Sequence, residues 1–302
     1  MTLEEANTYI DTNFKKLFDD YQNLNLLASM FDPDENSYFI GSNIGRFPKN
    51  EYERTKENID LKENVAGEVL IKSIPGGSFS PFLGNSDHLD TEKPNLEDIS
   101  SGMLIRNTYR SVFGTLGLIF KIKGRDKNYL LTNNHVIGRT IMLEDQDEAI
   151  IKCSNDKKIG AYKNGVINNY IDAAYAEITV KTAFEEQKRE PLSPISQEVT
   201  LNMTSVNNNL IKIMSSNAYV KVEDKYFYKE PKILRNQILI DKNMISGRSG
   251  TISLSENKSK IIGLLCAVND NYSILNNIHH VFDFIAKKEK ITKEDISIIN
   301  QF

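Results

Sequence analysis

The chain has 302 residues, of which 40% are hydrophobic and 9% aromatic, enough for one large domain with a sizeable core and an extension. The formal net charge is −4 and the pI is about 5.7, and this acidic balance argues against nucleic acid or an anionic membrane as the main partner. No stretch approaches the roughly 18 apolar residues of a membrane span, and the first residues show no leader with a basic and then an apolar region. We therefore expect a cytoplasmic protein.

The spacing of the cysteines and histidines indicates neither a disulfide framework nor a metal site. Cys153 and Cys266 each lie inside a predicted strand and form no disulfide framework, which favours free thiols in a reducing compartment. The two cysteines and the four histidines show no spacing typical of a zinc site. We expect no metal and no cofactor.

The N-terminal residues predict a helix over about 3–26. Thr2 and Glu5 form a capping-box pattern. Apolar residues then recur at close to helical spacing, namely Leu3, Ala6, Ile10, Leu17, Tyr21 and Leu24, with Phe14 and Phe18 widening the stripe. We expect this face to pack against the barrel, and docking of a partner or regulator protein is the alternative.

Two strands and two long irregular segments are predicted next. Residues 37–45 and 66–74 have strand character, and the charged stretch 48–64 between them predicts a flexible loop. Residues 74–107 are rich in Gly, Ser, Pro, Asn and Asp, which indicates a long connecting loop. Because this loop precedes the strand-rich part of the chain, it can reach a cleft there.

From residue 108 onward, short apolar runs alternate with polar turns, a pattern typical of antiparallel strands in sandwiches or barrels. Such runs lie at 149–151, 210–213, 219–222 and 251–254. The apolar spacing over 278–287 predicts a helix, and Thr292 with Asp295 is placed to cap a last short one. We divide the chain into an N-terminal extension, 1–107, and a barrel domain, 108–302.

Three polar residues of the second part suit nucleophilic catalysis. His135 stands where an apolar strand pattern breaks, Asp172 opens an apolar run, and Ser249 lies next to Gly250 and two residues after Gly247. A serine hydroxyl needs a histidine to accept its proton and a carboxylate to orient that histidine. Each residue alone has an ordinary interpretation as a core histidine, a turn aspartate or a loop serine. Their joint occurrence favours a triad.

The order of these residues selects between two architectures. α/β-Hydrolases place the serine first and the histidine last, whereas chymotrypsin-type barrels run His, Asp, Ser, as this chain does with His135, Asp172 and Ser249. In addition, Thr251 stands where the G-x-S-x-G motif of α/β-hydrolases requires glycine. The sequence therefore predicts a barrel.

Four sequence blocks resemble those of trypsin-like serine peptidases, in particular intracellular bacterial ones related to the plant narrow-leaf type. These blocks are the first strand at 114–119, the histidine block at 131–136, the aspartate block at 172–176 and the serine block at 247–250. The strand at 262–268, the closing strand at 272–277 and the helix from Ile278 extend the similarity over residues 114–285. The resemblance implies a mainly β fold, a chymotrypsin-like double antiparallel β-barrel with an N-terminal helical extension and a C-terminal helix.

The resemblance also implies roles for further residues. The N–H groups of Gly247 and Ser249 would form the oxyanion hole, and Asn243 would lie at the floor of the substrate pocket. The pocket wall would include three consecutive residues, Cys266, Ala267 and Val268. Because position 243 is not acidic, we expect a small apolar or polar residue before the cut rather than a basic one.

The residue before the serine departs from the secreted enzymes. Arg248 stands where secreted trypsins carry the aspartate that captures a newly cut N-terminus, so this route of activation is not expected. Its guanidinium is either solvated or paired with a carboxylate elsewhere in the chain.

The resemblance implies a serine endopeptidase that cleaves a protein or peptide substrate through an acyl-enzyme, with a narrow specificity or a regulatory protein partner. A catalytically silent trypsin-fold module for peptide binding or scaffolding is the first alternative. A regulatory adaptor that acts through the N-terminal helix is the second.

Overall fold

The protein is represented by a computed structural model. It describes residues 1–44, 69–81, 99–109, 112–138, 150–153, 156–180, 190–191, 202–204, 210–223, 230–241, 248–255 and 260–299. The predicted loop 48–64 lies outside the described residues. No helix in the described part of the chain is long and apolar enough to cross a membrane.

An 11-stranded sheet contains a closed barrel. Strand β13 pairs with both β14 and β16, so the order β13-β14-β15-β18-β17-β16 returns to its start. Strands β1, β2 and β3 extend this sheet outward from β14, and β4 and β12 pair with β17. The strands are β1 (Leu24–Asp32), β2 (Ser37–Ile44), β3 (Ile71–Ser73), β4 (Ser80–Pro81), β12 (Glu190–Pro191), β13 (Asn202–Thr204), β14 (Leu210–Val222), β15 (Lys232–Ile240), β16 (Ile252–Ser255), β17 (Lys260–Val268) and β18 (Ser273–Asn277).

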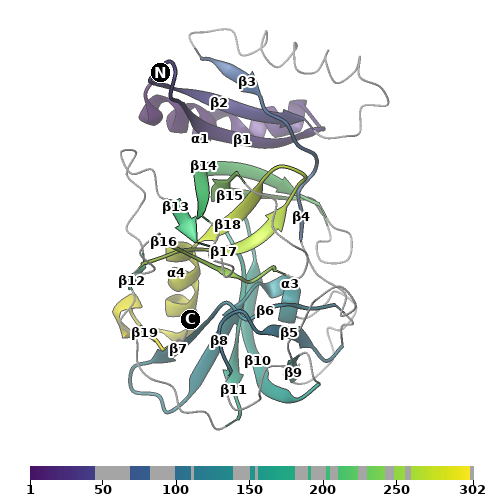
Figure 1. The fold of residues 1–302 in the computed structure, drawn as a ribbon, viewed down its shortest axis with the longest axis vertical. Coiled ribbons are helices and arrows are strands. Elements are labelled where there is room, and N and C mark those ends of the chain that lie inside the picture. The colour runs from purple at the N-terminus through teal and green to yellow at the C-terminus, as the bar shows by residue number, and fades with distance from the viewer. Residues whose placement is uncertain are drawn as a thin grey trace.

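An eight-stranded antiparallel sheet forms the other half, in the lower part of Figure 1. Its order is β19-β7-β8-β11-β10-β9-β5-β6, and β6 runs on through Leu116 and Gly117 into β7, so the sheet curls back on itself. The strands are β5 (Leu104–Asn107), β6 (Gly114–Thr115), β7 (Leu118–Ile122), β8 (Asn128–Thr132), β9 (Ile150–Cys153), β10 (Lys158–Ile167), β11 (Asp172–Ile178) and β19 (Ile296–Ile298). The predicted fold class, a chymotrypsin-like double β-barrel, is confirmed.

One apolar core joins the two halves to helix α4 (Ile278–Glu289). It contains Phe120 and Leu131 of the eight-stranded sheet, Leu264 of the closed barrel, and Ile278 and Phe282 of the helix, all buried. The helix follows β18 directly, and Asn277 caps its first turn by accepting a hydrogen bond from the His279 N–H. Burial of this helix face therefore fixes how the two barrels meet.

Helix α1 (Leu3–Asp20) carries the predicted capping box of Thr2 and Glu5, with both hydrogen bonds present. It packs its apolar face mainly on β1 and β2, which with β3 form the N-terminal layer, in a cluster with Leu27 and Ile40. The expected contact with the barrel is made through Tyr219 of β14. The predicted end at residue 26 is wrong, because Leu24 already belongs to β1. Strand β1 pairs with β2 on one side and with β14 on the other, and the hydrogen bonds to these two strands outweigh the helical spacing of the apolar residues.

Other boundaries also differ from the sequence prediction. The runs 210–213 and 219–222 are one continuous strand, β14, whose register shifts let it bend between partners. The segment 74–107 is not all loop, since it contains β4 and β5. The cap of Thr292 and Asp295 is present, but it starts a single 3₁₀ turn (Lys293–Asp295) followed by β19. Strands before and after residue 107 pair in both sheets, and the division there stays a prediction.

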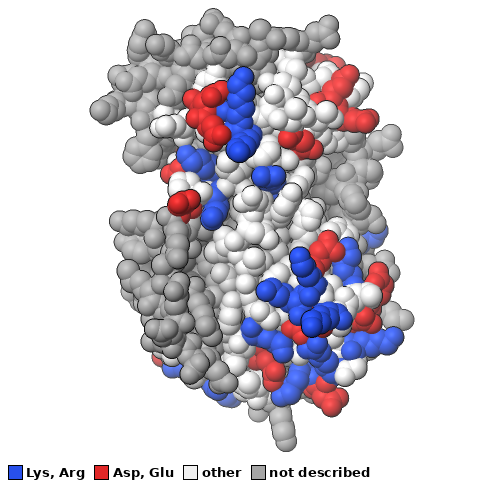
Figure 2. Space-filling model, turned by 180° about the vertical axis from the view of Figure 1, so that it is seen from behind, with Lys and Arg blue, Asp and Glu red and all other residues white. Residues whose placement is uncertain are grey.

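The charged surface shows both signs side by side. Over the lower half of the face in Figure 2, Lys and Arg side chains lie among Asp and Glu side chains. Lys127 pairs with Glu177 at 2.7 Å and Lys293 with Asp283 at 2.8 Å. Exposed pairs of this kind contribute little to stability.

A buried carboxylate ties α4 to the eight-stranded sheet and gives a stability prediction. Glu289 accepts a hydrogen bond from the Tyr175 hydroxyl and pairs with Arg125. Replacing Glu289 with alanine leaves the buried Tyr175 hydroxyl without its acceptor. We expect Glu289→Ala to lower the free energy of unfolding by about 2 kcal/mol, measured by thermal or urea unfolding.

Two variants control this measurement. Glu289→Gln keeps an acceptor for Tyr175 and should lose less stability. Glu35→Ala removes an exposed carboxylate 3.8 Å from Lys72 and should be nearly neutral. Equal stability of Glu289→Ala and the parent protein would contradict the expected role of Glu289.

Candidate active site

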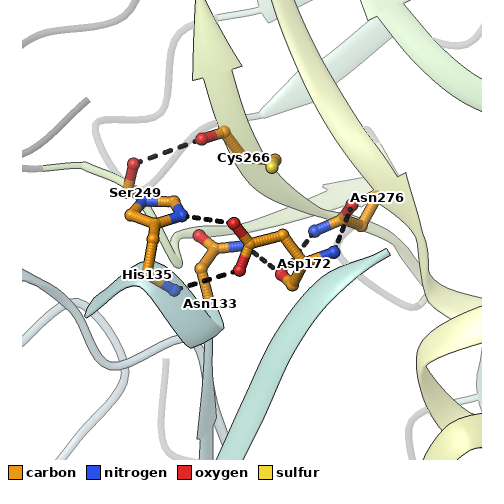
Figure 3. A network of polar contacts seen from close by, with 6 residues as sticks. All are labelled: Asn133, His135, Asp172, Ser249, Cys266 and Asn276. Atoms are coloured by element: carbon orange, nitrogen blue, oxygen red, sulfur yellow. Dashed lines mark hydrogen bonds and ion pairs between the residues drawn. The ribbon is translucent and has the colours of Figure 1, made fainter. Parts of the chain in front are cut away.

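His135 lies on the one-turn helix α3 (Asn134–Ile137), just after β8 ends at Thr132. Its side chain is buried. The ring atom Nδ1 lies 2.7 Å from Oδ2 of Asp172, and the backbone N–H of His135 donates a 3.1 Å hydrogen bond to Oδ1 of the same carboxylate (Figure 3). Asp172 thus holds both the backbone and the ring of the histidine, the arrangement that orients an imidazole for proton transfer.

Asp172, the first residue of β11, is fully buried and is held by two buried asparagines. Asn276 of β18 accepts a hydrogen bond from the Asp172 N–H with Oδ1 at 3.2 Å and donates from Nδ2 to the Asp172 carbonyl at 2.8 Å. Asn133, between β8 and α3, donates to the same carbonyl at 2.7 Å. Asp172 is therefore fixed from both halves of the molecule at once.

Ser249 lies in a turn between the two halves and is buried. Its carbonyl oxygen accepts a 2.7 Å hydrogen bond from the Thr115 N–H of β6, across the junction. Its hydroxyl oxygen lies 3.4 Å from the carbonyl oxygen of Cys266, and the side chain of Cys266 lies beside His135 and Asp172 (Figure 3). The structure thus brings His135, Asp172 and Ser249 together from three separate segments.

Two glycines let the halves approach this closely. Gly250 has φ of +96°, and a Cβ there would lie 2.2 Å from the carbonyl oxygen of Thr115 and from Oγ1 of Thr132. A Cβ on Gly117 would lie 2.3 Å from the carbonyl oxygen of Gly250. Any side chain at either position would push the serine turn away from the eight-stranded sheet.

The predicted pocket wall is strand β17, where Cys266, Ala267 and Val268 are consecutive and buried. Asn243 and Gly247 lie outside the described residues, so the pocket floor and the first oxyanion donor stay predictions. Arg248 is half-buried, and in the described part of the chain it forms no ion pair with a carboxylate.

Cys266 also lies beside the His135–Asp172 pair, a position that the sequence did not indicate. Ligand atoms of these three residues lie within 4.8 Å of one another. However, Nδ1 of His135 already bonds the carboxylate, and burial, followed by the negative charge of Asp172, raises the pKa of the Cys266 thiol. This set is therefore described as a hydrogen-bonded His135–Asp172 pair with a neutral thiol beside it.

The sequence prediction missed Asn133, Asn276 and Thr115. Asparagine is uncommon inside buried strands, because its amide must find partners there. An asparagine within the predicted strand 272–277 was therefore a usable signal. Its partner was not predictable, since Asp172 is far away in the sequence.

Comparison with known proteins gives matches only among solved structures. No protein-family model matches the chain, and no curated protein matches it. A glutamic acid-specific serine protease is 11% identical with a TM-score of 0.47, over 66% of this chain and 100% of its own. Thermobifida fusca Protease A is 12% identical with a TM-score of 0.46, over 67% and 99%.

Cellulomonas bogoriensis chymotrypsin is 12% identical with a TM-score of 0.44, over 68% of this chain and 100% of its own. All three TM-scores are below 0.5, so the fold assignment rests on the strand pairing described above and not on these similarities.

The burial of Cys266 predicts slow alkylation. Iodoacetamide reacts with thiolates, and the raised pKa keeps this thiol protonated through neutral pH and beyond its ordinary range. We expect mass spectrometry to find Cys266 unmodified in the folded protein at pH 8 and modified after unfolding in urea. A Tyr109→Cys variant, at a site 46% exposed, supplies the reactive control. Modification of Cys266 at the rate of the control would contradict the prediction.

Proposed function

We propose that the chain is a serine endopeptidase in which Ser249 is the nucleophile, His135 the general base and Asp172 the residue that orients it. The observation that carries this proposal is the buried hydrogen bond between His135 and Asp172 at the junction of two barrels, with Ser249 in contact with the neighbouring Cys266. A buried carboxylate with no such partner would be strongly unfavourable.

The proposed reaction gives each of the three side chains one role. As the Ser249 oxygen attacks the peptide carbonyl, its proton passes to Nε2 of His135, and Asp172 stabilises the imidazolium through the Nδ1–H. Collapse of the tetrahedral intermediate breaks the C–N bond, and His135 returns the proton to the leaving amine. A water molecule, deprotonated by His135, then hydrolyses the acyl-enzyme and regenerates Ser249.

The finer parts of the sequence prediction belong to the same proposal. The N–H groups of Gly247 and Ser249 stabilise the oxyanion, and Asn243 with the wall of Cys266, Ala267 and Val268 selects the residue before the cut. The substrate is a protein or peptide, and a regulatory protein partner limits the activity.

We further propose a cytoplasmic setting and a relation to the intracellular bacterial peptidases. Both cysteines are buried free thiols, which supports a reducing compartment.

Covalent labelling by a fluorophosphonate probe tests the proposed nucleophile without a known substrate. The wild-type protein should be labelled at one site, because the probe reacts with an activated serine. Ser249→Ala should not be labelled at all, and His135→Ala should react at least about 1,000-fold more slowly. In-gel fluorescence measures the rates, and peptide mapping identifies the site.

The outcomes separate the proposed function from its alternative. Labelling at Ser249 that depends on His135 supports the peptidase. No labelling of the folded wild-type protein, alone or with candidate partners present, would favour the catalytically silent peptide-binding module instead.

Asn276 gives a second, independent prediction. It bonds both backbone groups of Asp172, so Asn276→Ala should let the carboxylate shift relative to His135. We expect the rate of fluorophosphonate labelling to fall about tenfold, since a loss of about 1.4 kcal/mol of transition-state stabilisation corresponds to that factor.

Asn217→Ala is the matched control. Asn217 is also a buried strand asparagine, but its amide bonds Asn7 and Asp11 of helix α1, away from Asp172. It should lose stability without a change in the rate of fluorophosphonate labelling. An Asn276→Ala labelling rate equal to that of the wild-type protein would show that Asn276 has a structural role only.

A further inference from the structure

Strand β4 (Ser80–Pro81), from the N-terminal extension, pairs with the strand that borders the candidate active site. Its pairing with β17 is antiparallel, with Ser80 opposite Val268 and Pro81 opposite Ala267. On the other edge of β17, the same two residues pair with Ile274 and Ser273 of β18. Strand β4 therefore occupies the second edge of β17, the only one left for a further strand at these residues.

The edge of β17 that β4 occupies lies close to the proposed nucleophile, Ser249. Ala267 and Val268 follow Cys266, whose carbonyl oxygen lies 3.4 Å from the Ser249 hydroxyl oxygen. An antiparallel strand on this edge runs from Val268 toward Cys266. An extended peptide that continues in this direction by one residue beyond the position of Pro81 would thus arrive beside Ser249.

Buried contacts hold the occupant in place. Phe79 is fully buried in the cluster that contains Cys266 and Ala267, and its carbonyl accepts a hydrogen bond from the Glu223 N–H at 3.2 Å. Asn269, which directly follows the end of β17, donates from Nδ2 to the Gly77 carbonyl at 3.1 Å. These tethers keep Ser80 and Pro81 at a high effective concentration on the edge.

We propose that Ser80–Pro81 is a resident occupant, from the same chain, of the edge of β17 at Ala267–Val268, where the main chain of a peptide substrate would otherwise pair. A peptide substrate must displace this segment before its backbone can pair there. The inference deepens the proposed function, on which it rests for the catalytic consequence. The binding event itself does not require catalysis.

The chemistry of the occupant is consistent with displacement. Strand addition depends on main-chain hydrogen bonds, so any extended peptide can compete. Proline has no N–H, so Pro81 stands at a position of the pair where no N–H bonds to β17, and a peptide with another residue there can pair equally well.

A reversible crosslink tests the proposal. Opposed residues of antiparallel strands have Cα atoms about 4.5–5.5 Å apart, within the range of disulfides, so Ser80→Cys combined with Val268→Cys should lock β4 in place after oxidation. The probe is a fluorescein-labelled peptide with the sequence of residues 74–81, and its binding is followed by fluorescence polarisation. In a Ser249→Ala background, we expect the oxidised form to bind this peptide at least tenfold more weakly than the reduced form.

A second variant loosens the occupant instead. Phe79→Ala removes the buried anchor, so the labelled peptide should bind at least tenfold more tightly than to the Ser249→Ala parent. Phe39→Ala is the matched control, because Phe39 belongs to the same apolar cluster but lies on β2 and not beside β4. Phe31→Cys with Tyr38→Cys, opposed residues of the β1–β2 hairpin, controls for oxidation and should not alter binding.

Equal binding by the oxidised and reduced forms would overturn the proposal, as would no binding by either the reduced form or Phe79→Ala. Fluorophosphonate labelling of the same variants with Ser249 intact reports the nucleophile separately, because this small probe needs no extended backbone. Labelling that persists in the oxidised form while peptide binding is lost supports both proposals. Peptide binding as expected without labelling would overturn the proposed function alone.

Discussion

The candidate site at the junction of the two halves depends on one buried carboxylate. Asp172 is fully shielded from water, and a carboxylate in that position stays ionised only if hydrogen bonds replace its hydration. His135 supplies two of these bonds to the side chain. The backbone of Asp172 is bonded by Asn133 on one side of the junction and by Asn276 on the other. The site exists, therefore, only when both halves are folded and docked.

The two halves can dock in this way only if their backbones contact each other directly, with no side chain between them. The Thr115 N–H donates to the Ser249 carbonyl, and Gly117 and Gly250 leave room for that contact. The block 114–117, which the sequence presents as an ordinary strand start, thus serves the serine turn. Helix α4 seals the same junction from the side through buried apolar residues. Backbone hydrogen bonds and the burial of apolar side chains therefore stabilise the same junction between the two halves.

Local patterns predicted those parts of the fold that depend on neighbouring residues. The capping box at Thr2 and the helix from Ile278 follow from local spacing, and the strand 262–268 follows from the resemblance; all three are present. The chain order of His135, Asp172 and Ser249 indicated which architecture to expect. By contrast, the end of helix α1 and the strand pairing of Ser80–Pro81 depend on partners far away in the sequence. The hydrogen bonds between Asn276 and Asp172 could not be predicted from the sequence for the same reason.

The N-terminal layer is physically continuous with the turn that precedes Asp172. Arg235 of β15 stacks at 4.3 Å over the ring of Phe14 in helix α1, and its backbone N–H donates at 2.6 Å to the carbonyl of Asn169. Gln237 of the same strand donates at 2.7 Å to the carbonyl of Tyr170. A displacement of α1 changes the support of β15, and β15 holds the turn whose next residues lead into Asp172. The extension therefore belongs to the folded unit that positions the carboxylate.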